Sequence, residues 1–419
     1  MKTFNRNRIF IRLFMLLFAI QGVTFGQNDY NTAYGKLKDS KTGEKITYAT
    51  ISVPGTNIGT VSNSDGEFIL KVNKSLHAEF FEVSHLGYET AKFRISEATD
   101  KERIFFLVAR PIQLTEVAII PKDARGIVET ALQKIKLNYS VTPNMMRGFY
   151  RESIRQRRDY ISVSEAVVDI VKAPYSGFQN DKVRIFKGRK GSNIKKADTL
   201  VVKLQGGPNV SLLLDIVKNT NLSIALDNLD NYKFEYSTVV YIDNKLNWVI
   251  SFSPAVVREQ PLYFGKLFIS QDNMAIMRAE FSLDLSNADK ASSMFIEKKP
   301  AGLIFMPTST SYLVTYKEQN GKFYLNYVRA DLKFRCDWKK RLFRNYYTVM
   351  SELAVTDRNE DNLMRFTSQE LFRENMIFTE KVQDLTDTEF WGENNIIEPD
   401  NSIENAIKKI SKKMMKEVK

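Results

Sequence analysis

Apolar and polar residues alternate in two short runs near the start of the chain. The first run covers residues 49–53 and the second covers residues 68–72, directly after Asp65-Gly66. Alternation with a period of two is typical of half-buried strands, and a turn glycine tolerates a positive φ. The pattern therefore predicts two strands that flank a hairpin turn.

Further strand-like runs surround this pair, with turn residues between them. They cover residues 33–38, 80–83 and 104–108. Short strands at this spacing are typical of a two-sheet module of about a hundred residues or fewer. We therefore expect an antiparallel β-sandwich over residues 27–110.

Four segments of this module carry a resemblance to a known family. They are residues 35–46, 54–60, 64–68 and 83–88, and they resemble the carboxypeptidase-like regulatory domain. The resemblance implies a transthyretin-like sandwich that accompanies other domains and carries no zinc ligands. In envelope proteins of the Bacteroidetes type, this domain often stands at the mature N-terminus, including in front of TonB-dependent receptors.

The pattern changes after the sandwich. Residues 111–124 form an extended linker with a strand-like run at 116–120, and helical periodicity follows at 124–137. Residues 125–355 are mostly strands with short turns, plus a short apolar helix at 212–217. A meander this wide curls, so we expect a bent, half-barrel-like sheet with a packed helix. Residues 356–419 are predicted to be helical. The predicted fold class is mainly β with α.

Two weaker resemblances concern this second part. The hairpin of residues 263–280 is similar in style to the periplasmic lipoprotein-carrier fold. Residues 149–152, 164–175 and 390–399 resemble uncharacterised Bacteroidetes envelope proteins, whose longer members end in an outer-membrane barrel. The sequence lacks the many further amphipathic strands of such a barrel, so a receptor or channel is not expected.

Residues 1–26 read as a secretory signal. Four basic residues precede a short apolar core, and small residues follow it at the expected cleavage position. Removal of this segment lowers the formal net charge from +12 to +8. We therefore expect export, to the periplasm or to an outer-membrane-associated position.

Basic residues form three runs, at 155–158, 184–196 and 339–344, and a final helix carries six lysines from Lys408 to Lys419. Ser402 is the predicted cap of this helix. The three runs either bind an anionic envelope polymer or lipid, or they form solvated hairpin tips. The final helix either rests on a membrane surface or docks on the rest of the protein. No recognisable nucleic-acid module is present.

The sequence offers few residues for catalysis or metal binding. Cys336 is the single cysteine, and His77 and His85 are the only histidines, so neither a thiolate with a base nor a zinc site is expected. Residues 192–195 fit Ser-x-x-Lys and residues 41–43 fit a β-lactamase triplet, in the wrong order for that enzyme class. We predict no catalytic, cofactor or metal site.

Paired carboxylates are the remaining catalytic candidates. Glu165 and Asp169 share one face of a regular strand because their offset is even, and Glu152 comes from an adjacent run. Converging carboxylates act as acid and base in glycan hydrolases. The commoner arrangement is pairing with arginine.

The sequence thus favours a non-catalytic adaptor of the cell envelope that binds an envelope protein, an anionic polymer or a lipid. The first alternative is a carrier of a lipophilic ligand inside the curved sheet. The second is an envelope glycan hydrolase that uses Glu152, Glu165 or Asp169.

Overall fold

The computed structural model describes most of the chain after the predicted signal. The described ranges are 29–111, 123–192, 206–219, 224–295, 302–338, 344–384 and 390–417. The predicted signal and the strand-like run at 116–120 lie outside them. The helices of the described ranges include none that is long and apolar enough to cross a membrane.

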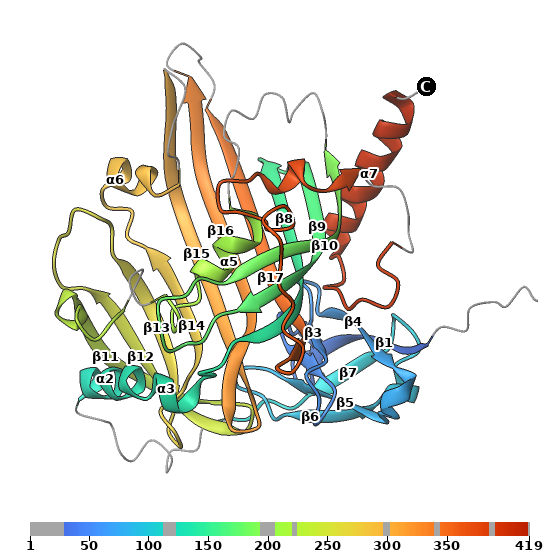
Figure 1. Ribbon diagram of the computed structural model, residues 1–419, viewed down its shortest axis with the longest axis horizontal. Helices are drawn as coiled ribbons and strands as arrows, with labels where there is room; N and C mark the ends of the chain where they lie inside the picture. Colours follow the sequence, from blue (N-terminus) through green and yellow to red (C-terminus); the bar gives the residue numbers. More distant parts are fainter. Residues whose placement is uncertain are drawn as a thin grey trace, which may run out of the picture.

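The first module is a sandwich of two small sheets (Figure 1). One sheet has the order β4-β1-β7 and the other has the order β3-β2-β5-β6. Alternate residues of the strands point inward and form one apolar core. The strands are β1 (Tyr30–Asp39), β2 (Thr50–Ser52), β3 (Gly59–Val61), β4 (Glu67–Asn73), β5 (Phe80–Ser84), β6 (Ala91–Arg94) and β7 (Ile104–Leu107), with 3₁₀ turns η1 (Lys74–Leu76) and η2 (Ile95–Glu97).

The predicted hairpin between residues 49–53 and 68–72 is wrong. β2 pairs with β3 and β5, whereas β4 pairs with β1 in the opposite sheet. The chain crosses between the sheets at Gly66, where φ is +77° and a Cβ would lie 2.8 Å from the carbonyl oxygen of Leu37. Two alternating runs beside a glycine turn therefore belong to different sheets.

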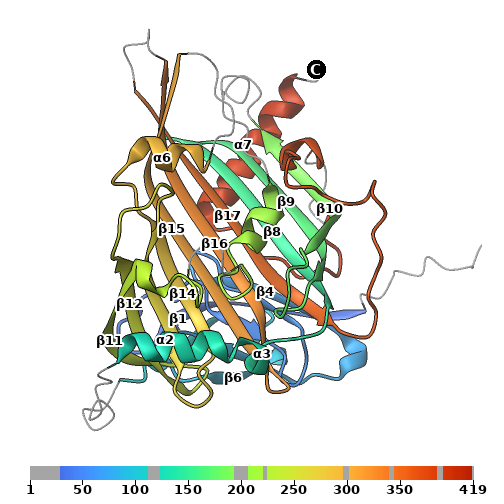
Figure 2. The ribbon, with the colours of Figure 1, turned by 60° about the vertical axis from the view of Figure 1, so that its left-hand side comes forward.

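The second part is one large open sheet of 11 strands in the order β11-β12-β13-β14-β15-β16-β17-β8-β9-β10-β18. It bends around a concave face (Figure 2). All neighbours are antiparallel except β18, which lies parallel to β10. The strands are β8 (Asn144–Gln156), β9 (Asp159–Lys172), β10 (Lys182–Ser192), β11 (Tyr232–Ile242), β12 (Lys245–Pro254), β13 (Tyr263–Ser270), β14 (Ile276–Leu283), β15 (Leu303–Gln319), β16 (Lys322–Trp338), β17 (Asn345–Asn359) and β18 (Gln383–Asp384). The predicted fold class is confirmed.

Short helices cover the concave side and the ends of this sheet. The helix predicted at 124–137 is interrupted at Lys134, giving α2 (Ala124–Gln133) and α3 (Ile135–Asn138), and Asp123 caps α2 through the amide of Gly126 at 2.7 Å. The helix predicted at 212–217 lies earlier in the chain, as α5 (Gly207–Leu213), and residues 214–217 are not helical. The other helical elements are η4 (Leu229–Asn231), α6 (Ala288–Ser293) and η5 (Phe378–Glu380).

The C-terminal part is less helical than predicted. β17 extends to Asn359, and of the described residues beyond it only η5 and α7 (Asn401–Glu417) are helical. The other described residues from 360 to 400 form turns, irregular segments and the short strand β18 instead of helix. The α7 helix is capped by Asp400, not Ser402, since the Asp400 carboxylate accepts a hydrogen bond from the Ile403 amide at 2.8 Å.

Residues 390–401, here called the strap, join the two parts. The strap lies between the sandwich and the convex face of the large sheet, where Trp391 and Ile397 pack with Phe149 and with Ile69 of β4 in one apolar cluster. Asn57 of the sandwich also exchanges hydrogen bonds with Arg358 at the end of β17. The sandwich therefore sits on the convex face through both apolar and polar contacts.

Candidate functional site

The three candidate carboxylates do not converge. Arg151 pairs with Glu165 in the β8–β9 register, which leaves Glu152 beside Ser164 on the other face of the sheet. Glu165 and Asp169 lie on the convex face, as their even offset predicted, and Glu152 lies on the concave face. The sheet itself separates the hydrolase candidates, so they cannot act as an acid and base on one substrate.

Both convex carboxylates pair with arginine. Asp169 contacts Arg147 at 3.0 Å and Arg184 at 2.6 Å, and Glu165 contacts Arg151 at 2.8 Å. Although burial alone would raise it, the neighbouring arginine charges hold the pKa of Glu165 below its ordinary value. Both carboxylates are therefore members of ion pairs with arginine.

Arg151 is the centre of a buried network on the convex face. Its guanidinium contacts Glu165 and Glu352, and it donates a hydrogen bond to the carbonyl of Ile397 in the strap. Arg151 is 1% exposed, and no ligand reaches it in this arrangement. The network holds the strap against the sheet.

Glu152 is the one candidate without a cationic partner among the described residues. It is 6% exposed, and its carboxyl accepts a hydrogen bond from the Tyr150 hydroxyl at 3.1 Å. Burial raises the pKa of Glu152 to about 7. The neighbouring Ser164 hydroxyl is buried without a partner in the described structure. A lone acid of this kind lacks the second group that hydrolysis needs.

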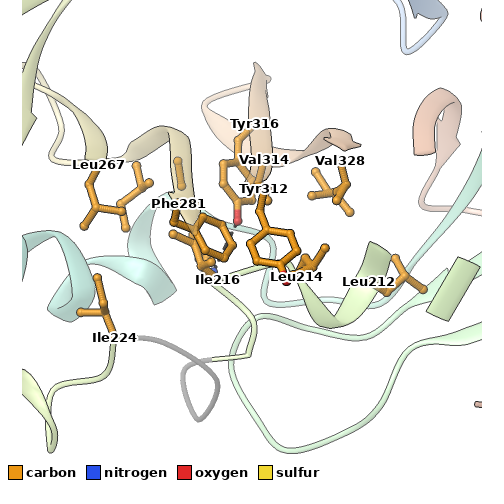
Figure 3. Packing of buried hydrophobic residues seen from close by; sticks show 14 of the residues in the cluster. Leu212, Leu214, Ile216, Ile224, Leu267, Phe281, Tyr312, Val314, Tyr316 and Val328 are labelled. Carbon is orange, nitrogen blue, oxygen red and sulfur yellow. Dashed lines mark hydrogen bonds between the residues drawn. The ribbon is translucent and has the colours of Figure 1, made fainter. Parts of the chain in front are cut away.

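Side chains of the chain itself cover much of the concave face. Leu212, Leu214 and Ile216 pack against Phe281, Tyr312 and Val328 of the sheet (Figure 3). These are the apolar positions that a carrier would use to line a cavity. In this conformation they contact one another.

A buried polar cluster fixes this covering segment. The Asp215 carboxylate contacts Lys172 at 2.8 Å and accepts hydrogen bonds from the hydroxyls of Tyr175 and Tyr316. Lys172 also contacts Asp181 at 2.7 Å. Although burial opposes it, these two carboxylates hold the pKa of Lys172 above its ordinary value. Lys172 and Asp215 are both 0% exposed, so the cluster anchors the chain and is closed to ligands.

Cysteine and histidine add no reactive centre among the described residues. Burial raises the pKa of the Cys336 thiol to about 11 and lowers the pKa of His85 to about 4. Within the described ranges, no group of three or more His, Cys, Asp or Glu side chains is arranged to hold a metal ion. Residues 193–195 of the Ser-x-x-Lys match lie outside those ranges.

A groove of about 440 Å³ lies beside β10. Its walls combine apolar and charged side chains, including Phe186, Phe372 and Arg184. Arg184 already pairs with Asp169 and Glu370, so its charge is neutralised. Sequence reasoning missed this groove because β10 meets residues 369–381 only in the folded chain.

The most distinctive exposed surface is the outer edge of β7. Ile104, Phe106 and Val108 point outward and are 37%, 52% and 47% exposed. The carbonyls of Arg103 and Leu107 bond to β1, so the backbone groups of Ile104 and Phe106 face away from it. No strand of the described structure pairs with this edge.

The opposite edge of the same sheet is capped. The side-chain amide of Asn395 in the strap accepts a hydrogen bond from the Lys71 amide at 2.6 Å and donates one to the Lys71 carbonyl at 2.9 Å.

The open part of the β7 edge is short. Val108, two residues after Phe106, is already paired, because its carbonyl accepts a hydrogen bond from the Glu89 amide. The open edge is thus confined to Ile104–Phe106. The sequence predicted the strand but not the place of β7 at the border of its sheet.

The sandwich matches a family model. The model of the CarboxypepD_reg-like domain matches residues 33–119, which supports the resemblance of the N-terminal module to this domain. No curated protein matches the chain.

Several solved structures are similar to this chain at low scores. An outer membrane lipoprotein-sorting protein domain from Vibrio parahaemolyticus is 8% identical with a TM-score of 0.25, over 57% of this chain and 93% of that one. A LolA superfamily protein from Nitrosomonas europaea is 11% identical with a TM-score of 0.20, over 57% and 94%. A membrane-associated protein of unknown function from Bacteroides fragilis is 11% identical with a TM-score of 0.15, over 78% and 97%. TM-scores this low say nothing about function.

Proposed function

We propose that this protein is a non-catalytic adaptor of the cell envelope, in which the sandwich binds an extended segment of a partner protein along β7. The open edge at Ile104–Phe106 carries this proposal. Unpaired backbone groups of an edge strand pair readily with another strand, and alternate side chains then add apolar contacts. We also propose that the protein is exported to the cell envelope and that it is an envelope protein of the Bacteroidetes type.

The fixed position of the sandwich supports this function. The strap covers β4 and packs the sandwich onto the large sheet, while β7 stays open. A partner strand added to β7 would extend the sheet without displacing any described contact of Ile104 or Phe106. The separation of Glu152 from Glu165 and Asp169 supports a function without catalysis.

A photo-cross-linking residue introduced at Phe106 tests the proposal in envelope extracts of cells that produce the protein. We expect a cross-link to one partner protein from position 106. The matched control is Leu76, an exposed apolar residue of the same module, which lies outside the edge and is 44% exposed. Cross-links from position 106 that fall only within the chain itself, or equal cross-linking from position 76, would contradict the proposal.

The carrier alternative has a separate readout. Mass spectrometry of the intact protein purified from envelope membranes would show a stoichiometric lipid if the concave face held one. Because Leu212, Leu214 and Ile216 already pack on that face, we expect the mass of the protein alone.

A further inference from the structure

Basic segments that are distant in sequence meet at one end of the large sheet. The β8–β9 turn contains Arg157 and Arg158, and the Arg157 amide donates a hydrogen bond to the carbonyl of Tyr346 at 3.1 Å. Arg344 precedes Tyr346 at the start of β17. All three arginine side chains are exposed. Two of the basic runs found in the sequence therefore lie at neighbouring strand ends.

The α7 helix adds its charge at the same end. Ile403 and Ala406 pack with Val163 and Met350, and Tyr160 and Ile407 join this cluster. Tyr160 follows the β8–β9 turn directly, so α7 passes the strand ends and leads away from the sandwich (Figure 1, Figure 2). The lysines at 408 and 409 are exposed on it, and the sequence of the helix then carries Lys412, Lys413 and Lys416.

The acidic residues at this end include Asp159, which follows Arg158 directly, and two others that pair with different cations. Asp337 contacts Arg335 at 3.0 Å, and Glu404 contacts Lys408 at 2.8 Å. Within the described ranges, no carboxylate forms an ion pair with Arg157, Arg158 or Arg344. The runs at 193–196 and 339–343 lie outside the described residues and are not part of this argument.

Two exposed side chains at this end suit a membrane interface. Tyr346, beside Arg157, is 46% exposed, and Met294, directly after α6, is 41% exposed. The hydroxyl of Ser292 in α6 bonds to the carbonyl of Phe305, and Phe305 is the partner of Cys336 near the same end of β16. Tyrosine is enriched where membrane proteins meet lipid headgroups.

We infer that this end of the sheet docks on an anionic phospholipid bilayer. The exposed cations are spread over several strand ends and one helix, so they can contact many negatively charged headgroups of a bilayer surface at once. Each basic residue near such a surface strengthens binding about five-fold. The sandwich contacts Arg358, whose strand partner on β8 is Met146. Met146 lies ten positions before Gln156 on β8, so this contact of the sandwich is at the opposite end of the strand from the basic end. A second contact is nearer, because Ser64 and Asp65 of the sandwich bond to Asp400 and Asn401 where α7 begins. No residue of β7 is among those that form the basic end.

Co-sedimentation with lipid vesicles tests this inference, with the chain from residue 27 onward. We expect binding to vesicles of phosphatidylcholine with one-quarter phosphatidylglycerol, little binding to pure phosphatidylcholine, and release as the salt concentration rises. The double variant Arg157→Gln/Arg158→Gln should bind anionic vesicles about 25-fold more weakly, at about five-fold for each charge removed. A chain ending at Ile410, which lacks the last four lysines, should also bind more weakly.

The matched control is Lys41→Gln/Lys74→Gln, which removes two exposed lysines of the sandwich. This variant should bind like the parent chain, and circular dichroism shows that each variant is folded. The inference is overturned if the parent chain does not bind anionic vesicles, if neutral vesicles bind it equally, or if both double variants lose the same affinity. It is also overturned if soluble polyphosphate binds the parent chain as tightly as the vesicles do. None of these results depends on a protein partner at β7.

Discussion

Arg151 donates a hydrogen bond from Nη2 to the backbone carbonyl of Ile397 at 2.6 Å and, from the same guanidinium, contacts Glu352 at 2.9 Å. One buried side chain thus joins the centre of the large sheet to the strap that holds the sandwich. The rigid presentation of the sandwich depends on this junction.

Replacement of Arg151 by methionine should therefore destabilise the whole protein. Glu165 and Glu352 would lose a buried cation, and breaking a buried ion pair by removal of one partner costs about 3–5 kcal/mol. The free energy of unfolding in urea measures this loss. The control is Arg125→Met, whose exposed pair with Asp230 contributes about 1 kcal/mol or less. Equal losses for both variants would contradict the role of the network.

Asn395 should hold the β4 edge. In Asn395→Ala, the amide and carbonyl of Lys71 lose both side-chain partners, which costs about 1–3 kcal/mol if they stay buried. Hydrogen exchange at the Lys71 amide should become faster, while exchange in β1 stays slow. Unchanged exchange at Lys71 would show that the strap does not cap this edge.

Asp215 should fix the segment that covers the concave face. Asp215→Ala leaves Lys172 with Asp181 alone and removes the acceptor of two tyrosine hydroxyls, so we expect a loss of about 3–5 kcal/mol. Hydrogen exchange should rise first in residues 207–219. If exchange instead rises equally throughout the sheet, the cluster does not act locally.

Glu152 should make stability depend on pH. Its folded pKa of about 7 lies above the ordinary 4.5, so the folded state holds a proton that the unfolded chain releases. The contribution of Glu152 to the free energy of unfolding is therefore largest below pH 4.5 and falls between pH 4.5 and pH 7. Above pH 7 it is lower by roughly 3 kcal/mol.

The variant Glu152→Gln tests this dependence. Urea unfolding from pH 5 to pH 8 should show that the variant gains stability over the parent chain as the pH rises. Glu370→Gln is the control, because hydrogen bonds from Thr367 and Arg184 lower the pKa of Glu370 to about 2, outside this window. A constant difference between Glu152→Gln and the parent would mean that Glu152 is ionised in the fold.

The sequence predicted the local structure better than its assembly. Alternation correctly placed β1, β5 and β7, and the even offset of Glu165 and Asp169 correctly gave them one face. The position of Glu152 depends on the β8–β9 register, which the pattern of one strand does not contain. The hairpin prediction failed for the same reason, because strand pairing is set by contacts across the sandwich.

The C-terminal part and the candidate surfaces were harder to predict. The charged sequence of residues 356–400 favours a helix, yet Trp391 and Ile397 are buried between the sandwich and the large sheet in a non-helical segment. The alternation along β7 explains the exposed side chain of Phe106, but the open backbone edge depends on the sheet order, which places β7 at a border. Arg157 and Arg344 are far apart in sequence and meet only through the pairing of β8 with β17.

The most direct test of the adaptor function is the affinity of the purified partner for the Phe106→Lys variant. The partner is the protein cross-linked from position 106, and Leu76→Lys is the matched control. A lysine at the open edge should weaken binding at least ten-fold, because it removes an apolar contact and places a charge where the partner strand pairs. The Leu76→Lys variant should bind like the parent chain. Equal affinity of the Phe106→Lys variant and the parent chain would contradict the account.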